Sequence, residues 1–376
     1  MTDFLPSVTV EEFKNIVKRQ FQAGLPRPIF GLGKGGIGKT ESIADLAKNE
    51  LNIGYIDIRL LLYSETDLKG VPYVNQEHTH TIWLQNDILP RVERDGEQGI
   101  LVLDEVTSCG KSVRTAAYQL LNEGRLGEYV LPSGWMIVCL GNGEEDGGGE
   151  FTGIEGNFAN RCSVFEVVAD LEAWKTWAYT QNIHPLVLAY LSWCPQHLHT
   201  FDWENEEFLF ASPRSWKAVS DILHLFPVQD PLTTAQINAN VGRSVGGNFL
   251  AFCQVQAQVP KAKDILKGEN VPHPQSQEGL LLQIQGVIYL LRQTIEEANC
   301  DFSAPELPKE LLESVIYGVN WMLSLERVEH QMMAIKDFMA SHNSNTQRLF
   351  LREEFTTGCP KLMEFIEEHH EILGDG

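Results

Sequence analysis

Apolar residues in the first 168 positions form short runs that alternate with helical stretches. The runs that favour strands are residues 28–32, 53–58, 100–103, 135–140 and 163–167. Residues 41–49, which follow the first run, have the pattern of a helix. Strands that alternate with helices are typical of a mainly parallel sheet covered by helices. The pattern therefore predicts an α/β architecture for this part of the chain.

Two local signals refine this prediction. Residues 9–23 are expected to form an opening helix, because Thr9 and Glu12 have the spacing of a capping box. Residues 128–131 and the run that starts at Trp135 are expected to form a β-hairpin, with its turn at Pro132-Ser133-Gly134.

From Asp170 onward the pattern is helical. The segment 259–277 contains three prolines and three lysines and no clear periodicity, and the stretches 279–299 and 308–342 after it predict long helices. We therefore predict an α/β domain at 1–168, an all-helical domain at 169–258, which could cover the α/β domain as a lid, and a C-terminal helical extension at 259–376.

The stretch Gly33-Lys34-Gly35-Gly36-Ile37-Gly38-Lys39-Thr40 matches G-x-x-x-x-G-K-[ST]. It lies between a predicted strand and a predicted helix, which is the context that a phosphate-binding P-loop requires. Its glycines let backbone amides approach an anion closely. We expect Lys39 to reach the β- and γ-phosphates of ATP, and the Thr40 hydroxyl to bind Mg²⁺.

A second acidic element follows the P-loop. The buried run 100–103 ends in Asp104-Glu105, at the carboxyl end of a predicted parallel strand, where ligands bind in such sheets. We expect Asp104 to hold Mg²⁺ and Glu105 to orient and polarise the attacking water.

Three further polar residues are candidates for catalysis. Asn142 follows the run 135–140 and is placed to hydrogen-bond the water or the γ-phosphate. Arg161 precedes the run 163–167, and we expect it to stabilise transition-state charge on the nucleotide of a neighbouring subunit. Arg114 and Arg125 are alternatives for that role. Arg214 lies in the first turn of a helix that Ser212 and Pro213 begin, from which it could point from the lid to the phosphates.

Composition limits the partners. The chain of 376 residues has 51 acidic and 29 basic side chains, a net charge of −22, so a protein partner is expected rather than nucleic acid or an anionic membrane. The seven cysteines form no C-x-x-C pair, which favours reduced thiols in the cytoplasm. Neither a secretory signal nor an apolar run of about 20 residues is found in the sequence.

The P-loop, the Asp104-Glu105 pair, Asn142, Arg161 and Arg214, taken together and in this order, resemble the motifs of the AAA+ ATPases, and among these the MoxR-like group. Four further segments resemble segments of MoxR-like proteins of bacteria and phages: residues 67–73, 117–121, 125–132 and 212–216. The resemblance covers roughly residues 25–255.

The resemblance implies roles for the matching positions. Lys39 and Thr40 correspond to Walker A, Asp104 and Glu105 to Walker B, and Asn142 to sensor 1, while Arg161 matches the arginine finger and Arg214 sensor 2. It also implies a homo-oligomeric ring, commonly a hexamer, with ATP bound between subunits and a client protein that is remodelled or matured. Members of this group often work beside a von Willebrand factor A domain protein, which would here be a separate polypeptide because the chain has no Asp-x-Ser-x-Ser motif. In this setting residues 60–80 are expected to form a loop or insertion on the ligand side of the sheet, with Tyr73 as a contact for the pore or a partner.

Two other functions stay open. The segment from Lys34 to Thr40 also resembles the deviant P-loop of ParA/MinD-type ATPases, in which an extra lysine reaches the partner's nucleotide in a sandwich dimer. The chain could also be a scaffold that binds nucleotide without hydrolysing it, but Glu105 argues against this, since a pure binder needs no water-polarising acid.

Overall fold

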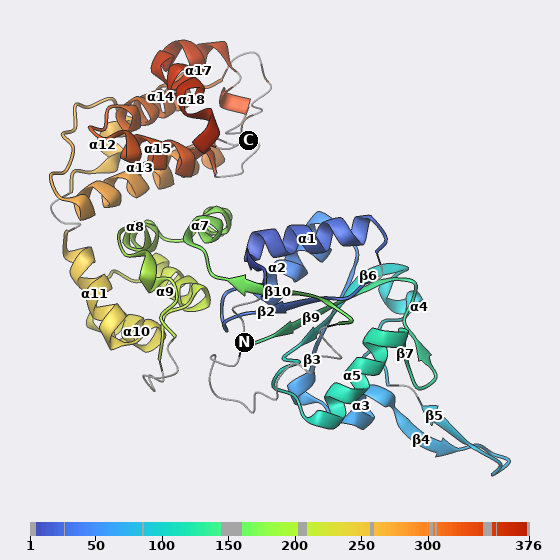
Figure 1. The fold of residues 1–376 in the computed structure, drawn as a ribbon. Helices are drawn as coiled ribbons and strands as arrows, with labels where there is room; N and C mark the ends of the chain where they lie inside the picture. The colour runs from blue at the N-terminus through green and yellow to red at the C-terminus, as the bar shows by residue number, and fades with distance from the viewer. Residues whose placement is uncertain are drawn as a thin grey trace. The chain divides into compact units, whose positions relative to one another are not determined.

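The chain divides into two compact units. The computed structural model describes residues 5–25, 27–84, 86–143, 160–201, 209–255, 259–298, 300, 304, 307–340, 348–350 and 352–373. The first unit comprises Met1–Asp170 with Phe201–Phe208, and the second comprises Leu171–Thr200 with Leu209–Gly376. The first contains the sheet, and the second is helical (Figure 1). The predicted subdivision of the helical region at residue 258 stays a prediction.

The first unit is built on a six-stranded parallel sheet. Its strand order is β1-β10-β2-β9-β6-β3. The strands are β1 (Ser7–Thr9), β2 (Ile29–Leu32), β3 (Gly54–Arg59), β6 (Gln98–Asp104), β9 (Gly134–Gly141) and β10 (Ser163–Val168). Each of the five predicted apolar runs forms one strand, so the predicted P-loop α/β fold followed by helices is confirmed.

Alternation along the strands sorts side chains onto the two faces of the sheet. On β6, Ile100 and Val102 belong to the core cluster that includes Phe13 of α1 (Val10–Gln22), whereas Leu101 and Leu103 belong to the cluster under α5 (Lys111–Glu123). Because successive strand residues point to opposite faces, a continuous apolar run marks a strand that is covered on both sides. Figure 1 shows α1 on one face and α5 on the other.

Of the two helices that cover the first face, the first begins as the sequence predicts, and the second begins two residues before the predicted residue 41. Thr9 caps α1, and the Glu12 carboxylate accepts from the Thr9 backbone amide at 2.8 Å, which completes the capping box. The helix after the P-loop is α2 (Lys39–Asp45), which continues as a π-helical turn, η2 (Leu46–Glu50).

The hairpin predicted around residues 132–134 is wrong in position. The paired strands are β7 (Arg125–Leu126) and β8 (Tyr129–Val130), and the turn between them is Gly127-Glu128. Gly127 adopts φ +60°, a conformation that glycine enters at no steric cost. The run from Gly134 cannot pair with β8 because both its edges bond to β2 and β6 in the core.

Residues 60–84 form an insertion after β3. It contains the 3₁₀ turn η3 (Leu60–Leu62), α3 (Glu65–Lys69), and the antiparallel strands β4 (Val71–Val74) and β5 (Thr81–Leu84). The hairpin of β4 and β5 extends past α3 and away from the sheet (Figure 1). The short α4 (Val92–Asp95) follows before β6.

The second unit is a set of helices on a long central one, α13 (Gln277–Glu297), which packs against α8 (Pro185–Trp193), α12, α14 and α15. Its other described elements are α7 (Leu171–Thr180), η5 (Pro195–His197), α9 (Pro213–Leu225), α10 (Pro231–Val241), α11 (Arg243–Gln254), α12 (Ala262–Leu266), α14 (Lys309–Leu323), α15 (Val328–Met339), α17 (Glu353–Gly358) and α18 (Pro360–Leu373). Among the described residues, no helix has both the length and the apolar character needed to cross a bilayer.

The long helix predicted over 308–342 is two helices. The chain leaves the helical path after Leu323 and re-enters it at Val328. Leu325 is buried at 2% exposure in the connection, and its carbonyl accepts from the Gln331 side chain at 2.6 Å. The apolar periodicity continues across the break because both helices bury a face against the same core, so sequence alone gives one run.

A buried polar network joins the first and the later helices of the second unit. Lys175 of α7 lies 2.7 Å from Asp337 of α15, and both side chains are 3% exposed. Gln285 of α13 donates to the same carboxylate at 2.7 Å and accepts from the Tyr179 hydroxyl at 3.1 Å. Burial raises the pKa of Asp337, and the charge of Lys175 opposes that shift.

Asp337→Ala is expected to destabilise the second unit, because it leaves the buried Lys175 ammonium with only the exposed Glu172 carboxylate, 3.6 Å away. The expected loss is about 3–5 kcal/mol, measured by urea unfolding of the full chain. Lys217→Ala removes an exposed pair with Asp221 in the same unit and serves as the control, with an expected loss of about 0–1 kcal/mol. Equal small losses in both variants would contradict the importance of the network.

Candidate functional site

The P-loop follows β2 at the carboxyl edge of the sheet. Gly33 sits so close to β10 that a Cβ there would meet the Val167 carbonyl oxygen at 2.1 Å, so only glycine fits. Gly38, the residue before α2, has φ +97°, which glycine alone adopts easily. These two glycines therefore let the loop turn tightly from β2 into α2, with its backbone amides ahead of the helix, where anions bind.

Lys39 is held inside the loop. Its side chain is 7% exposed, and its ammonium donates to the carbonyls of Gly33 at 2.6 Å and Lys34 at 2.8 Å. It also lies 3.4 Å from the Asn142 side-chain oxygen at the end of β9. The structure thus brings together the predicted phosphate-binding lysine and the predicted sensor asparagine.

Thr40 and Asp104 meet across β9, which lies between β2 and β6 in the sheet. The Thr40 hydroxyl donates to Asp104 Oδ2 at 2.8 Å, which joins the start of α2 to the end of β6. A hydroxyl and a carboxylate are oxygen ligands of the kind that Mg²⁺ prefers, with water and phosphate oxygens completing the shell. The two residues therefore fit a magnesium ion that is bound together with a nucleotide.

Several carboxylates gather near this pair. Burial, and then repulsion from Asp104, raises the pKa of Asp57 on β3, and Glu41 and Glu105 add to that repulsion. A divalent cation at Asp104 would offset this accumulated negative charge. Asp57 was not among the residues expected from the sequence, because a single acid on an apolar strand gives no signal by itself.

Glu105 occupies an unusual backbone conformation. Its φ is +58°, which is uncommon for a residue with a side chain, and its amide donates to Asp104 Oδ1 at 2.8 Å. The chain leaves β6 at this point and turns, and the Ser108 backbone amide donates to the Glu105 carbonyl at 3.1 Å. Such conformations cluster at functional sites, where neighbouring structure holds them in place.

Asn142 is fixed by a residue that the sequence did not point out. Its backbone amide donates at 3.1 Å to the hydroxyl of Thr107, which is 2% exposed. Thr107 lies in the turn after Glu105, so this hydrogen bond links the turn that carries Glu105 directly to Asn142. A lone threonine three residues after an Asp resembles any core threonine, which explains why it was missed.

Arg161 and the P-loop lie at opposite ends of two neighbouring parallel strands. It precedes β10, whose Ser163 pairs with Ile29 at the start of β2, whereas the P-loop follows the end of β2. At about 3.3 Å per residue, the six residues from Arg161 to Val167 beside Gly33 span roughly 20 Å. Arg161 is exposed, and it cannot reach the phosphate cradle of its own chain.

The two alternative arginines differ in their surroundings. Arg114 is 4% exposed on α5 and donates to the Cys109 carbonyl at 2.8 Å, so it supports the turn that follows Asp104 and Glu105. Arg125 is exposed at the start of β7. Arg214 belongs to the second unit, where it is an exposed residue in the first turn of α9, capped by Ser212. Its predicted role at the phosphates stays a prediction.

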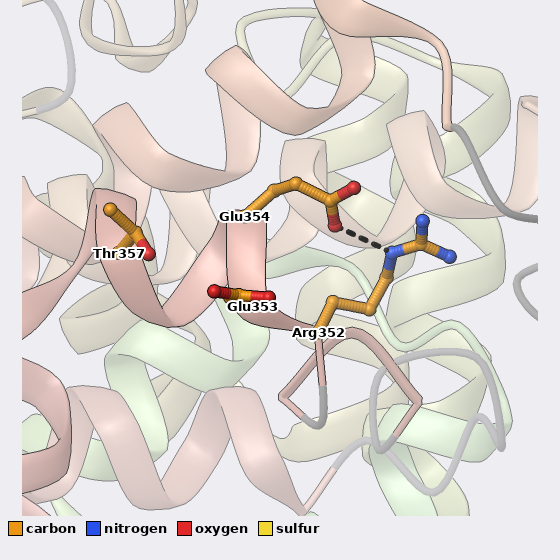
Figure 2. Close-up of a pocket in the computed structure, with 4 residues that line it drawn as sticks. All are labelled: Arg352, Glu353, Glu354 and Thr357. Carbon is orange, nitrogen blue, oxygen red and sulfur yellow. Dashed lines mark hydrogen bonds and ion pairs between the residues drawn. The ribbon is translucent and has the colours of Figure 1, made fainter.

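A separate pocket lies far along the chain. It has a volume of about 550 Å³ and is lined by Arg352, Glu353, Glu354 and Thr357, as Figure 2 shows. The Arg352 guanidinium lies 3.2 Å from the Glu354 carboxylate and donates to the Ala304 carbonyl at 2.7 Å. Its acidic lining does not suit a nucleotide, so we assign the candidate site to the P-loop region.

Comparison with known proteins adds the following. No family model matches the chain, and no curated protein matches it significantly. Among solved structures it is similar to closed-state Hsp104 with ATPγS and casein, at 16% identity and a TM-score of 0.36, covering 70% of this chain and 46% of that one. The chain therefore spans about half the length of Hsp104.

Two further solved structures are similar. One is a protein from Cytophaga hutchinsonii, provisionally assigned as an ATPase, at 14% identity and a TM-score of 0.32, covering 70% of this chain and 91% of that one. The other is NtrX from Brucella abortus in complex with ADP, at 14% identity and a TM-score of 0.32, covering 94% of this chain and 68% of that one. At these values the similarities say nothing about function, which has to follow from the residues of this chain.

Lys39→Ala is expected to abolish ATP binding, because it removes the cation that the loop holds at the phosphate position. Binding of a fluorescent ATP analogue to the purified chain measures this. Lys48→Ala is the matched control, since Lys48 is an exposed lysine on η2 whose ammonium lies over the Tyr55 ring at 4.9 Å. We expect the control to bind ATP as the native chain does, and equal affinity of both variants would contradict the site.

Proposed function

We propose that the chain is a Mg²⁺-dependent AAA+ ATPase of the MoxR-like kind, which hydrolyses ATP at sites between subunits to remodel or mature a client protein. The observation that carries the proposal is the 2.8 Å contact of the Thr40 hydroxyl with Asp104, directly beside the loop-held ammonium of Lys39. A loop that can bind a triphosphate, next to ligands for a divalent cation, is the arrangement that phosphoryl transfer requires.

Each residue has a task in this reaction. Lys39 and the loop amides bind the β- and γ-phosphates, and Thr40 with Asp104 holds magnesium, which neutralises developing charge when bound. The Glu105 carboxylate accepts a hydrogen bond from the attacking water and aligns it with the γ-phosphate. Asn142, 3.4 Å from the Lys39 ammonium, is near enough to contact the same water or phosphate.

The position of Arg161 favours a site shared by two subunits. The roughly 20 Å between Arg161 and the P-loop of its own chain exceeds the reach of an arginine side chain. An exposed arginine at the amino ends of the strands can instead meet the nucleotide of a neighbouring subunit in a ring. Closed rings arise when one surface of a subunit binds a different surface of the next. We therefore propose a homo-oligomer, with a hexamer as the expected form, and Arg214 as the arginine that the helical lid contributes.

The hairpin of β4 and β5 supports contact with a protein. Its residues Val71, Tyr73, Val74 and Leu84 are between 49% and 59% exposed. Residues 71–84 contain one acid and no Lys or Arg, in a chain of net charge −22. Exposed apolar patches of this kind mark interaction sites. We propose that the hairpin, with Tyr73, contacts the client, and that a separate von Willebrand factor A domain protein assists.

Glu105→Gln is expected to retain ATP binding and lose hydrolysis, because the amide cannot accept the proton of the attacking water. General-base catalysis is worth about 100- to 10,000-fold, so phosphate release should fall by at least about 100-fold. Nucleotide-bound assemblies should accumulate, as measured by size-exclusion chromatography with ATP. Glu97→Gln, which makes the same change at an exposed position before β6, is the control and should hydrolyse ATP normally. Unchanged release from Glu105→Gln would rule out the assigned role.

Arg161→Ala and Lys34→Ala distinguish the ring from a ParA/MinD-type dimer. Loss of a trans-acting arginine should lower turnover by about 1,000-fold or more, whereas the exposed Lys34 should be dispensable in a ring. The measurement is steady-state ATPase activity at saturating ATP. An inactive Lys34→Ala variant beside a normal Arg161→Ala variant would favour the dimer instead.

A further inference from the structure

Arg161 sits in a short turn that leads into β10. Asn160 and Arg161 are exposed, whereas the next residue, Cys162, is 2% exposed and belongs to the core under α5. A residue that must meet a nucleotide on another subunit needs a fixed backbone, since small displacements cost much of its effect. Burial of Cys162 fixes one side of the turn.

The other fixing element is Arg27. Its Nη2 atom donates to the Asn160 carbonyl at 3.0 Å and to the Cys162 carbonyl at 2.9 Å. These two carbonyls flank Arg161 on either side, so one guanidinium nitrogen bridges the turn. Hydrogen bonds from a charged donor are roughly twice as strong as neutral ones.

Arg27 also has a defined place relative to the P-loop strand. It lies two residues before β2, and the Pro28 carbonyl accepts from the Ser163 amide at 2.9 Å. From there β2 runs directly to Gly33. The turn that carries Arg161 is therefore attached, through Arg27 and β2, to the strand that ends in the phosphate cradle of the same chain.

From this geometry we infer that Arg27 is a positioning residue for the trans-acting Arg161. It holds the backbone on both sides of Arg161, so that the guanidinium of Arg161 is presented in one orientation to the neighbouring subunit's nucleotide. The inference rests on the proposed function. Arg27 itself touches no nucleotide, and its loss should lower the turnover of the neighbouring site while leaving ATP binding at its own site intact.

Arg27→Gln is the principal variant, because glutamine keeps a polar side chain but loses the charge and the bridging geometry. We expect an ATP affinity equal to that of the native chain, unchanged assembly, and a fall in kcat of about 10-fold or more, because a misplaced catalytic group loses much of its effect. Arg27→Lys keeps the charge and should lose less. Arg19→Gln, the same change at an exposed position on α1, is the control and should leave kcat unchanged.

Mixed assemblies separate positioning in trans from damage to the variant's own site. Glu105→Gln subunits hydrolyse nothing but present an intact Arg161 turn. Mixed before assembly with Arg27→Gln subunits, they should restore hydrolysis at the Arg27→Gln sites towards the native rate. Arg161→Ala subunits offer no guanidinium and should restore nothing in the same experiment. Failure of Glu105→Gln to restore activity, or a native kcat for Arg27→Gln alone, would overturn the inference.

The outcome also separates this inference from the proposed function. An inactive Arg161→Ala variant beside an active Arg27→Gln variant overturns only the role of Arg27. A fully active Arg161→Ala variant overturns the shared site itself. Should Arg27→Gln lose stability, as judged by its melting temperature, Arg27→Lys carries the same test, with a smaller defect and the same pattern of restoration.

Discussion

The parallel pairing of β2, β9 and β6 is the constraint on which the candidate site depends. The carboxyl ends of parallel strands lie at the same side of the sheet, so the residues that follow these strands meet although they are far apart in the sequence. Lys39 and Thr40 come after β2, Asn142 after β9, and Asp104 ends β6. The hydrogen bond of Thr40 to Asp104 spans the strand between them and closes the site. A strand order that moved β2 away from β6 would separate the candidate phosphate-binding lysine from the candidate metal-binding carboxylate.

The sequence predicted those parts of the molecule in which local pattern and tertiary role coincide. Buried strands need continuous apolar runs, and a phosphate loop needs its glycines, so both are visible in the residues themselves. The hairpin at Gly127-Glu128 was misplaced because a Pro-Ser-Gly sequence is also a turn signal, and only sheet pairing shows that Trp135 belongs to a core strand. The break after Leu323 was missed because both helices bury apolar residues against one core.

Residues that act by positioning another residue could not be predicted from the sequence. Thr107 and Arg27 work by hydrogen bonds to backbone atoms distant in the chain, and neither belongs to a motif. Gln285 illustrates the same limit in the helical unit. It interrupts an apolar run, yet it is 1% exposed and completes the network of Lys175 and Asp337. A polar residue within an apolar run can therefore be either exposed to solvent or buried with a hydrogen-bond partner. Only the tertiary packing shows which of the two applies.

The contact of Gly33 with the Val167 carbonyl has a consequence beyond its own loop. β10 touches the phosphate cradle at one end and carries the Arg161 turn at the other. A side chain at position 33 would have to displace β10, and with it Arg161, which is proposed to act on the next subunit. In the proposed ring, one such protomer would thus impair two nucleotide sites, its own and its neighbour's, so an altered copy would harm assemblies that also contain unaltered ones. The glycine at this position would therefore constrain the proposed ring as a whole and not just the chain that carries it.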